Sequence, residues 1–133
     1  MRMSRVIKFR IWDGNKIIYI TDTYTGKGLL FNDDEYYLVD DAYHGQHRVK
    51  INSLMQFTGL LDKNGVEIYE GDIIKYDDGN YDGEENWMEN IVSAEVYYNE
   101  NNSSFNDGLF LFNDIRDFEV IGNIHQNPDL VTE

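Results

Sequence analysis

Residues 60–69, with the sequence Leu-Leu-Asp-Lys-Asn-Gly-Val-Glu-Ile-Tyr, contain the pattern that decides the fold. Asn64 and Gly65 stand at its centre. The Asn-Gly pair is among the strongest short-range signals for a β-hairpin, because both residues tolerate a positive φ. The apolar and β-branched residues around this pair favour extended chain. The stretch therefore predicts a hairpin whose strands occupy residues 60–61 and 66–69.

A second hairpin is predicted near the start of the chain. Apolar and basic side chains alternate over residues 6–12, and this period of two is typical of a half-buried strand. The alternation assigns Ile7, Phe9 and Ile11 to the core face and Lys8 and Arg10 to the solvent face. Asp13-Gly14 then provides a tight turn, and residues 16–21 provide the return strand.

Seven further segments combine β-forming residues with turn residues at their ends, so each predicts a short strand. These segments are residues 29–31, 36–39, 48–52, 73–76, 92–98, 109–112 and 118–124. Residues 77–90 are acidic and aperiodic, and they predict a long loop. Because we find no amphipathic helix of three turns, we expect an all-β fold, a small barrel or sandwich of short antiparallel strands.

The length of 133 residues favours a single domain. We expect an N-terminal β region over residues 1–53, a C-terminal β region over residues 54–126 and a tail over residues 127–133. The side chains expected to be mostly buried are Phe9, Ile11, Ile68, Ile73, Val96, Phe110, Val120 and Ile121. The chain has no cysteine, no signal-peptide pattern and no long apolar run, so we expect a cytoplasmic protein.

The net charge of −14 is concentrated in the second half of the chain. Residues 1–60 contain eight basic and seven acidic residues, giving +1, whereas residues 61–133 contain three basic and eighteen acidic residues, giving −15. Such a charge repels DNA phosphates and anionic membranes, so we expect neither as a direct partner. The same charge also promotes solubility, which is the simpler interpretation.

Three blocks of the sequence resemble the YopX family of phage and prophage proteins. They are residues 7–13, residues 54–74 and residues 120–128, in the order of the family and framing nearly the whole chain. The resemblance implies a phage or prophage origin and an all-β fold whose C-terminal part is SH3-like. The family has no agreed activity, so it implies no catalytic or binding residue here. Turn and core roles explain most of the residues in the blocks.

The acidic stretch contains one motif with metal-ligand spacing. Asp78, Asn80 and Asp82, followed by Gly83 and then by Glu89, match the spacing of an EF-hand loop. Calcium takes six to eight oxygen ligands, and these four side chains begin such a set. The flanking segments, however, are predicted strands rather than helices. A calcium site and a solvated acidic loop therefore both remain as interpretations, and no other cofactor is expected.

Other candidate sites are weaker. His44 and His47 lie close in sequence to Asp40 and Asp41, and zinc could use such ligands. A loop with two incidental histidines is a simpler interpretation than a zinc site. Neither a nucleophile elbow nor a phosphate-binding loop is present, so no catalytic residue is predicted. A nucleic-acid contact or a solvated strand face would each explain the basic residues near the start of the chain, Arg2, Arg5, Lys8 and Arg10.

Three functions remain as hypotheses. The first is an accessory protein of phage or prophage that binds a host or phage protein through a β surface or an edge strand. The second is an acidic mimic of nucleic acid that occupies a host nucleic-acid-binding protein. The third is a small enzyme, which would need a polar pocket.

Overall fold

The computed structural model describes residues 7–20, 28–32, 35–39, 48–51, 53–112 and 117–132. Strands dominate these ranges, and the α-helix described there, α1 (Leu109–Phe112), has only four residues. The prediction of an all-β fold of short antiparallel strands is confirmed. The chain divides into two compact units, Met1–Phe57 (unit 1) and Thr58–Glu133 (unit 2). The boundary expected between residues 53 and 54 lies at the start of the strand that leads from unit 1 into unit 2.

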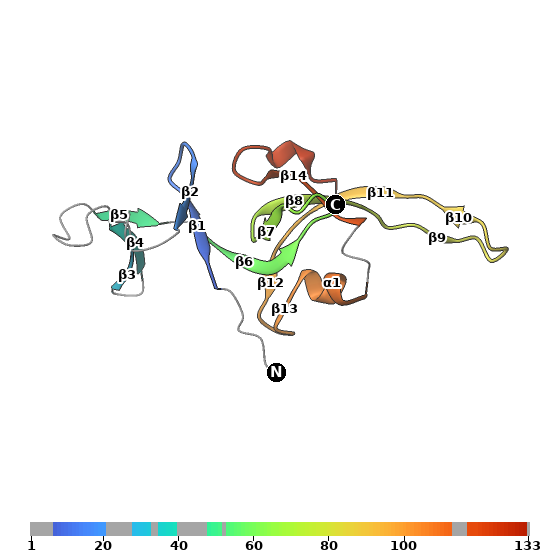
Figure 1. Ribbon diagram of the computed structural model, residues 1–133, viewed down its shortest axis with the longest axis horizontal. Helices are drawn as coiled ribbons and strands as arrows, with labels where there is room; N and C mark the ends of the chain where they lie inside the picture. Colours follow the sequence, from blue (N-terminus) through green and yellow to red (C-terminus); the bar gives the residue numbers. More distant parts are fainter. Residues whose placement is uncertain are drawn as a thin grey trace. The chain divides into compact units, whose positions relative to one another are not determined.

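The first sheet of unit 1 is built around the N-terminal hairpin (Figure 1). Strand β1 (Phe9–Trp12) pairs on one side with β2 (Ile17–Ile20) and on the other with the first part of β6 (Leu54–Leu61). The Asp13 carboxylate accepts hydrogen bonds from the backbone N–H groups of Asn15 (2.8 Å) and Lys16 (2.9 Å). The predicted hairpin turn at Asp13-Gly14 is therefore present.

A second described sheet of unit 1 follows the first hairpin in the sequence. Its strands are β3 (Gly28–Asn32), β4 (Glu35–Val39) and β5 (Arg48–Ile51), and each pairs antiparallel with the next. The three strands were predicted within one or two residues. Their side chains lie outside the described residues, as do Arg2, Arg5 and the His44–His47 loop with Asp40 and Asp41.

The predicted solvent face of β1 is wrong. Arg10 is only 4% exposed, and its neighbour Ile11, on the opposite face, is also buried. Both faces of this strand are therefore covered, whereas the alternating sequence predicted that only one would be. Ile7, assigned to the core, is 64% exposed because it precedes the paired residues. Lys8 places its ammonium group 4.8 Å from the ring centre of Phe57, a cation–π contact.

Unit 2 contains the main described sheet, in which β8 (Asp72–Asp77) lies between β11 (Ile91–Glu95) and β14 (Glu119–Asn123). The second part of β6 pairs with β7 (Glu67–Tyr69) through the Asn64-Gly65 hairpin, as predicted. The described sheets are not closed into a barrel, so the barrel alternative is not supported, whereas a sandwich of short strands is consistent with them. The SH3-like likeness stays a prediction.

The core of unit 2 gathers side chains from all of these strands. Its buried members are Ile68, Ile74, Tyr76, Ala94, Val96 and Phe118. Of the residues predicted to be buried, Ile11, Ile68, Ile73 and Val96 are buried, whereas Phe9, Phe110, Val120 and Ile121 are only partly buried. Phe118, 1% exposed, was not predicted, although it is the largest of the fully buried side chains.

Residues 109–112 form α1 and not the predicted strand. The three residues before it, Asn106, Asp107 and Gly108, all have positive φ (49°, 54° and 85°). This local reversal starts the helical turn, and a short apolar run such as Leu-Phe-Leu-Phe has no periodicity that separates strand from helix. No helix among the described residues is long and apolar enough to cross a membrane.

Candidate functional site

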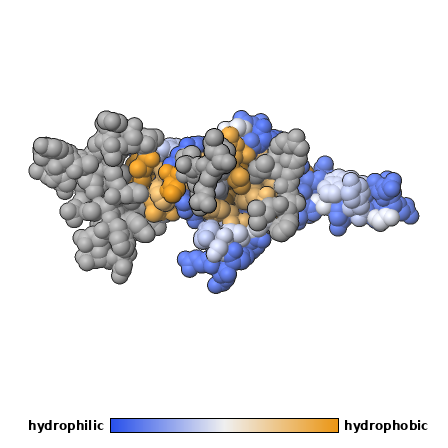
Figure 2. Space-filling model, turned by 60° about the horizontal axis from the view of Figure 1, so that its bottom comes forward, coloured by the Kyte–Doolittle hydropathy of each residue, from blue (hydrophilic) through white to orange (hydrophobic). Residues whose placement is uncertain are grey.

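Residues 77–91, which we call the acidic hairpin, leave the main sheet of unit 2 between β8 and β11 (Figure 1). They contain two short antiparallel strands, β9 (Asn80–Tyr81) and β10 (Trp87–Met88), in which Tyr81 faces Trp87 and Asn80 faces Met88. The predicted long loop over residues 77–90 is therefore wrong. Residues 80–91 are all exposed. In Figure 2 this region is coloured mostly as hydrophilic.

Asp77 organises the base of the acidic hairpin. One oxygen of its carboxylate accepts the backbone N–H groups of Gly79 and Asn90, each at 2.9 Å, and the other accepts the indole N–H of Trp87 at 2.6 Å. The Asn90 bond, together with the Gly79 and Trp87 bonds, outweighs desolvation and lowers the pKa of Asp77. This carboxylate therefore joins the two strands and fixes the indole.

Asp82 organises the tip. Its carboxylate accepts the backbone N–H of Glu84 (2.8 Å) and the side-chain amide of Asn86 (3.3 Å), and its own N–H donates to the Asn86 carbonyl (3.0 Å). The Glu84 bond is the main cause of a lowered pKa at Asp82. Next to the tip, the rings of Tyr81 and Trp87 meet edge to face, with centres 5.2 Å apart. Such aromatic pairs are typical stabilisers of hairpins.

The four residues of the predicted calcium site all lie on this hairpin. Asp78 and Glu89 are at its base, Asn80 lies in β9, and the Asp82 carboxylate is engaged by the turn. The flanking elements are strands, as the sequence predicted. Among the described residues, no group of three or more acidic or histidine side chains is placed to hold a metal ion. Calcium binding at Asp78, Asn80, Asp82 and Glu89 stays a prediction.

Gly79 is expected to be indispensable for the hairpin. A Cβ atom at this position would lie 2.0 Å from the backbone oxygen of Met88, a contact that no side-chain movement can relieve. We therefore expect Gly79→Ala to separate the strands and abolish the upfield ring-current shifts of Tyr81 and Trp87 in an NMR spectrum, with the rest of unit 2 unchanged. Asn80→Ala, an exposed neighbour, is the control and should preserve these shifts. Retained shifts in Gly79→Ala would contradict the described hairpin.

A groove of about 480 Å³ runs along the base of the acidic hairpin, and we call it the hairpin groove. The acidic hairpin contributes Trp87, Glu89 and Ile91 to its lining. On the sheet, Lys75 of β8 faces Glu119 of β14 in register, and Glu119 in turn pairs with Lys63 at 3.1 Å. Asp77, Asp117 and Tyr76 complete the described lining. The groove thus combines an indole with charged groups of both signs.

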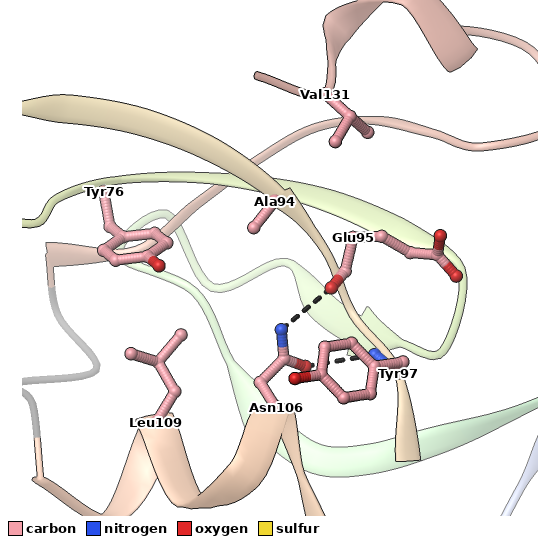
Figure 3. A pocket seen from close by; sticks show the side chains of 7 residues that line it. All are labelled: Tyr76, Ala94, Glu95, Tyr97, Asn106, Leu109 and Val131. Carbon is pink, nitrogen blue, oxygen red and sulfur yellow. Dashed lines mark hydrogen bonds between the residues drawn. The ribbon is translucent and has the colours of Figure 1, made fainter. Parts of the chain in front are cut away.

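A second cavity of unit 2, about 400 Å³, is shown in Figure 3. The side-chain amide of Asn106 accepts the Tyr97 N–H (3.0 Å) and donates to the Glu95 carbonyl (2.8 Å). The Tyr97 hydroxyl donates to Asp107 at 2.6 Å, and this is the largest cause of a lowered pKa at Asp107. These polar groups therefore extend the backbone pairing of β11 and hold the turn before α1.

Comparison with known proteins places the chain in a family. A family model described as YopX protein matches residues 8–132, nearly the whole chain. The chain belongs to the YopX family. It is also similar to the crystal structure of protein EF1440 from Enterococcus faecalis, with 26% sequence identity, a TM-score of 0.51, and coverage of 96% of this chain and 99% of that chain. No curated protein matches the sequence.

The three YopX-like blocks lie in strands and turns of this YopX-family chain. The first lies around β1, the second covers β6 to β8, and the third covers β14 and the turn after it. In that turn, Asn123 accepts the backbone N–H groups of His125 and Gln126, and a Cβ at Gly122 would lie 2.5 Å from the Asn127 side-chain oxygen. The third block is thus explained by a crowded turn.

The acidic hairpin lies between the second and third blocks. Sequence reasoning reached its acidic residues through the calcium spacing but missed Asp77 and the Tyr81–Trp87 pair. The available signal was two aromatic residues placed symmetrically around Glu84 in a stretch without any basic residue.

Proposed function

We propose that this YopX-family chain acts by binding another protein and that the acidic hairpin is its contact surface. The observation that carries the proposal is the combination, on one exposed hairpin, of uncompensated carboxylates with large hydrophobic side chains. Neither feature alone would distinguish a binding surface from a soluble one. Together they match protein interfaces, in which charge guides encounter and buried aromatic residues supply affinity.

The acidic hairpin itself contains no basic residue. No lysine or arginine occurs between Lys75 and Arg116. The exposed acidic side chains of the hairpin are Asp78, Asp82, Glu84, Glu85 and Glu89. A one-signed patch of this kind raises the association rate with a basic partner and makes that rate sensitive to salt.

The hydrophobic part of the surface is equally exposed. Tyr81 is 65% exposed and Met88 57%, while Trp87 and Ile91 are each about half exposed. Aromatic residues and methionine are enriched where proteins contact one another, and a gathering of them on a polar hairpin has no role in the core of the unit. These side chains supply the area that a partner would bury after charge has brought it close.

The competing mode, binding through a free strand edge, receives less support from the main sheet. On the β11 edge, Ser93 exchanges hydrogen bonds with Thr132, and Asn106 occupies the Glu95 carbonyl. On the β14 edge, the Val120 N–H donates to Asp62 at 2.9 Å and the Phe118 carbonyl accepts the Lys63 N–H at 2.9 Å. Occupied edges are a common protection against strand addition.

The partner that fits this surface is a protein with a basic, partly apolar groove. A phage or prophage accessory protein in the cytoplasm would meet such surfaces on host nucleic-acid-binding proteins. Mimicry of nucleic acid is therefore the second candidate function, and the exposed carboxylates are the feature that supports it. A competition experiment distinguishes mimicry from other protein binding, because duplex DNA would displace a mimic from its partner.

The test is affinity capture from a bacterial lysate, followed by measurement of association with the captured protein. Replacing Glu84 and Glu85 by lysine should slow association at low salt by about tenfold, because steering by the exposed patch is reversed. The melting temperature should not fall, because both side chains are exposed.

The control carries the same change of charge outside the hairpin. Glu100→Lys with Asp129→Lys, both exposed, alters the net charge equally and should have a much smaller effect on association. Equal slowing by both pairs would show that only the total charge matters. Binding that is insensitive to salt and to the hairpin variants would contradict the proposal.

A further inference from the structure

We propose that the hairpin groove receives an arginine side chain of the partner. The inference rests on the proposed function and names the chemical group that the surface recognises. Charge complementarity and the presence of an indole in the lining point to a planar cation. The groove volume of about 480 Å³ is ample for one long side chain.

The charges of the described residues that line the groove leave a negative excess. Four carboxylates, Asp77, Glu89, Asp117 and Glu119, face two ammonium groups, Lys63 and Lys75. Lys63 and Glu119 pair at 3.1 Å, and the Asp77 carboxylate already accepts three N–H groups.

Glu89 and Asp117 are the carboxylates of the lining that no described residue engages. Both are exposed, and neither has an ion-pair or hydrogen-bond partner among the described residues. They offer a cation four oxygen atoms at the rim of a groove that already holds an indole.

Trp87 makes the groove selective for the shape of the cation. Its N–H bond to Asp77 (2.6 Å) and its edge-to-face contact with Tyr81 hold the indole in place before any ligand arrives. A guanidinium group is planar, stacks on aromatic rings and binds a carboxylate through two parallel N–H bonds. An ammonium group is a compact, strongly hydrated charge and gains less from the same wall. Arginine is therefore preferred to lysine.

The probe is the tripeptide acetyl-Gly-Arg-Gly-amide, titrated into the full chain. The chain has two tryptophans, so its NMR spectrum contains two indole N–H signals, and Trp87→Phe assigns them. We expect the peptide to shift the Trp87 signal saturably and to leave that of Trp12 unchanged. The lysine peptide should bind at least about fivefold more weakly. The citrulline peptide, which has nearly the same shape without the charge, should not bind.

Matched variants separate the groove from general electrostatics. Glu89→Gln and Asp117→Asn should each weaken binding by about fivefold, and Lys75→Gln should strengthen it, because a repelling ammonium group is removed. Glu100→Gln, an equal loss of charge at an exposed site outside the groove, should change nothing. Equal shifts with the citrulline peptide, or equal weakening by Glu100→Gln, would overturn the inference.

The two proposals fail independently. If the hairpin reversal slows the partner but the arginine peptide does not bind, the groove is not an arginine site and the acidic surface remains. If the peptide binds the groove but the reversal has no effect on the partner, the arginine site stands and the role of the hairpin in steering is refuted.

Discussion

Asp62→Ala is expected to lower the free energy of unfolding by about 3–5 kcal/mol. The Asp62 side chain is buried, and its carboxylate accepts three backbone N–H groups, those of Asn64 (2.8 Å), Val66 (2.9 Å) and Val120 (2.9 Å). Two of these bonds close the β6–β7 turn, and the third attaches that turn to β14. Removing the carboxylate leaves all three donors without their acceptor. Urea unfolding at neutral pH measures the loss.

Two variants serve as controls for Asp62. Asp62→Asn retains one carbonyl oxygen for the turn but directs an N–H group at the Val120 N–H, so an intermediate loss is expected. Asp82→Ala removes a similar cap from an exposed turn and should leave the free energy of unfolding nearly unchanged. An Asp62→Ala variant as stable as the parent would contradict the described role of the carboxylate.

The contribution of Asp62 is also expected to depend on pH. Burial opposes its ionisation, but the N–H groups of Val120, Val66 and Asn64 outweigh burial and lower its pKa below the ordinary value of 3.8. The stabilisation is therefore complete above the pKa of the unfolded chain and disappears as the pH falls through the lower pKa of the folded chain. The stability difference between parent and Asp62→Ala should accordingly narrow as the pH is lowered from about 5 to about 2.

Phe118→Ala is the second change with a large expected effect, a loss of about 3–5 kcal/mol in the free energy of unfolding. The Phe118 ring is fully buried and lies with its centre 5.0 Å from that of Tyr76 and 5.1 Å from that of Phe110. Truncation removes the contact with both rings and leaves a cavity between β8, β14 and α1. Urea unfolding followed by circular dichroism measures the change.

The sequence predicted burial of Phe9 and Phe110 but not of Phe118. Because Phe110 is only partly buried, Phe110→Ala is expected to cost clearly less than Phe118→Ala. Leu61→Ala, at a side chain that is half exposed, should change the free energy by no more than about 0.5 kcal/mol. A larger loss at Phe110 than at Phe118 would show that the described core is incorrect.

Features that depend on neighbours in the chain could be predicted from the sequence. The turns at Asp13-Gly14 and Asn64-Gly65 were predicted because turn chemistry acts over two to four residues, and the structure contains both. Period-two alternation likewise located most strands to within a few residues. The charge of the second half and the resemblance to the YopX family also follow from residue identity alone.

The acidic hairpin shows where this local reasoning ends. Residues 77–90 have no alternating pattern, yet they pair, because Asp77 joins positions thirteen residues apart and Trp87 packs on Tyr81. Their acidic character was evident from the sequence, whereas their pairing was not. The candidate groove depends further on β14, which lies far away in the sequence and brings Glu119 beside Lys75.

Which side chains are buried depends on contacts between segments that are distant in the sequence. The alternation in β1 predicted that Arg10 would face solvent. Arg10 is buried instead, because both faces of β1 are covered. The apolar residues 109–112 suit a strand, yet Leu109 begins a helical turn because the three residues before it adopt positive φ. Asp62 caps its own turn through local chemistry, but its bond to Val120, 58 positions away, exists only because β14 returns to that turn. Burial and long-range hydrogen bonds depend on which segments meet in space. A local residue pattern contains only one of the two segments in such a contact, so it cannot predict the contact.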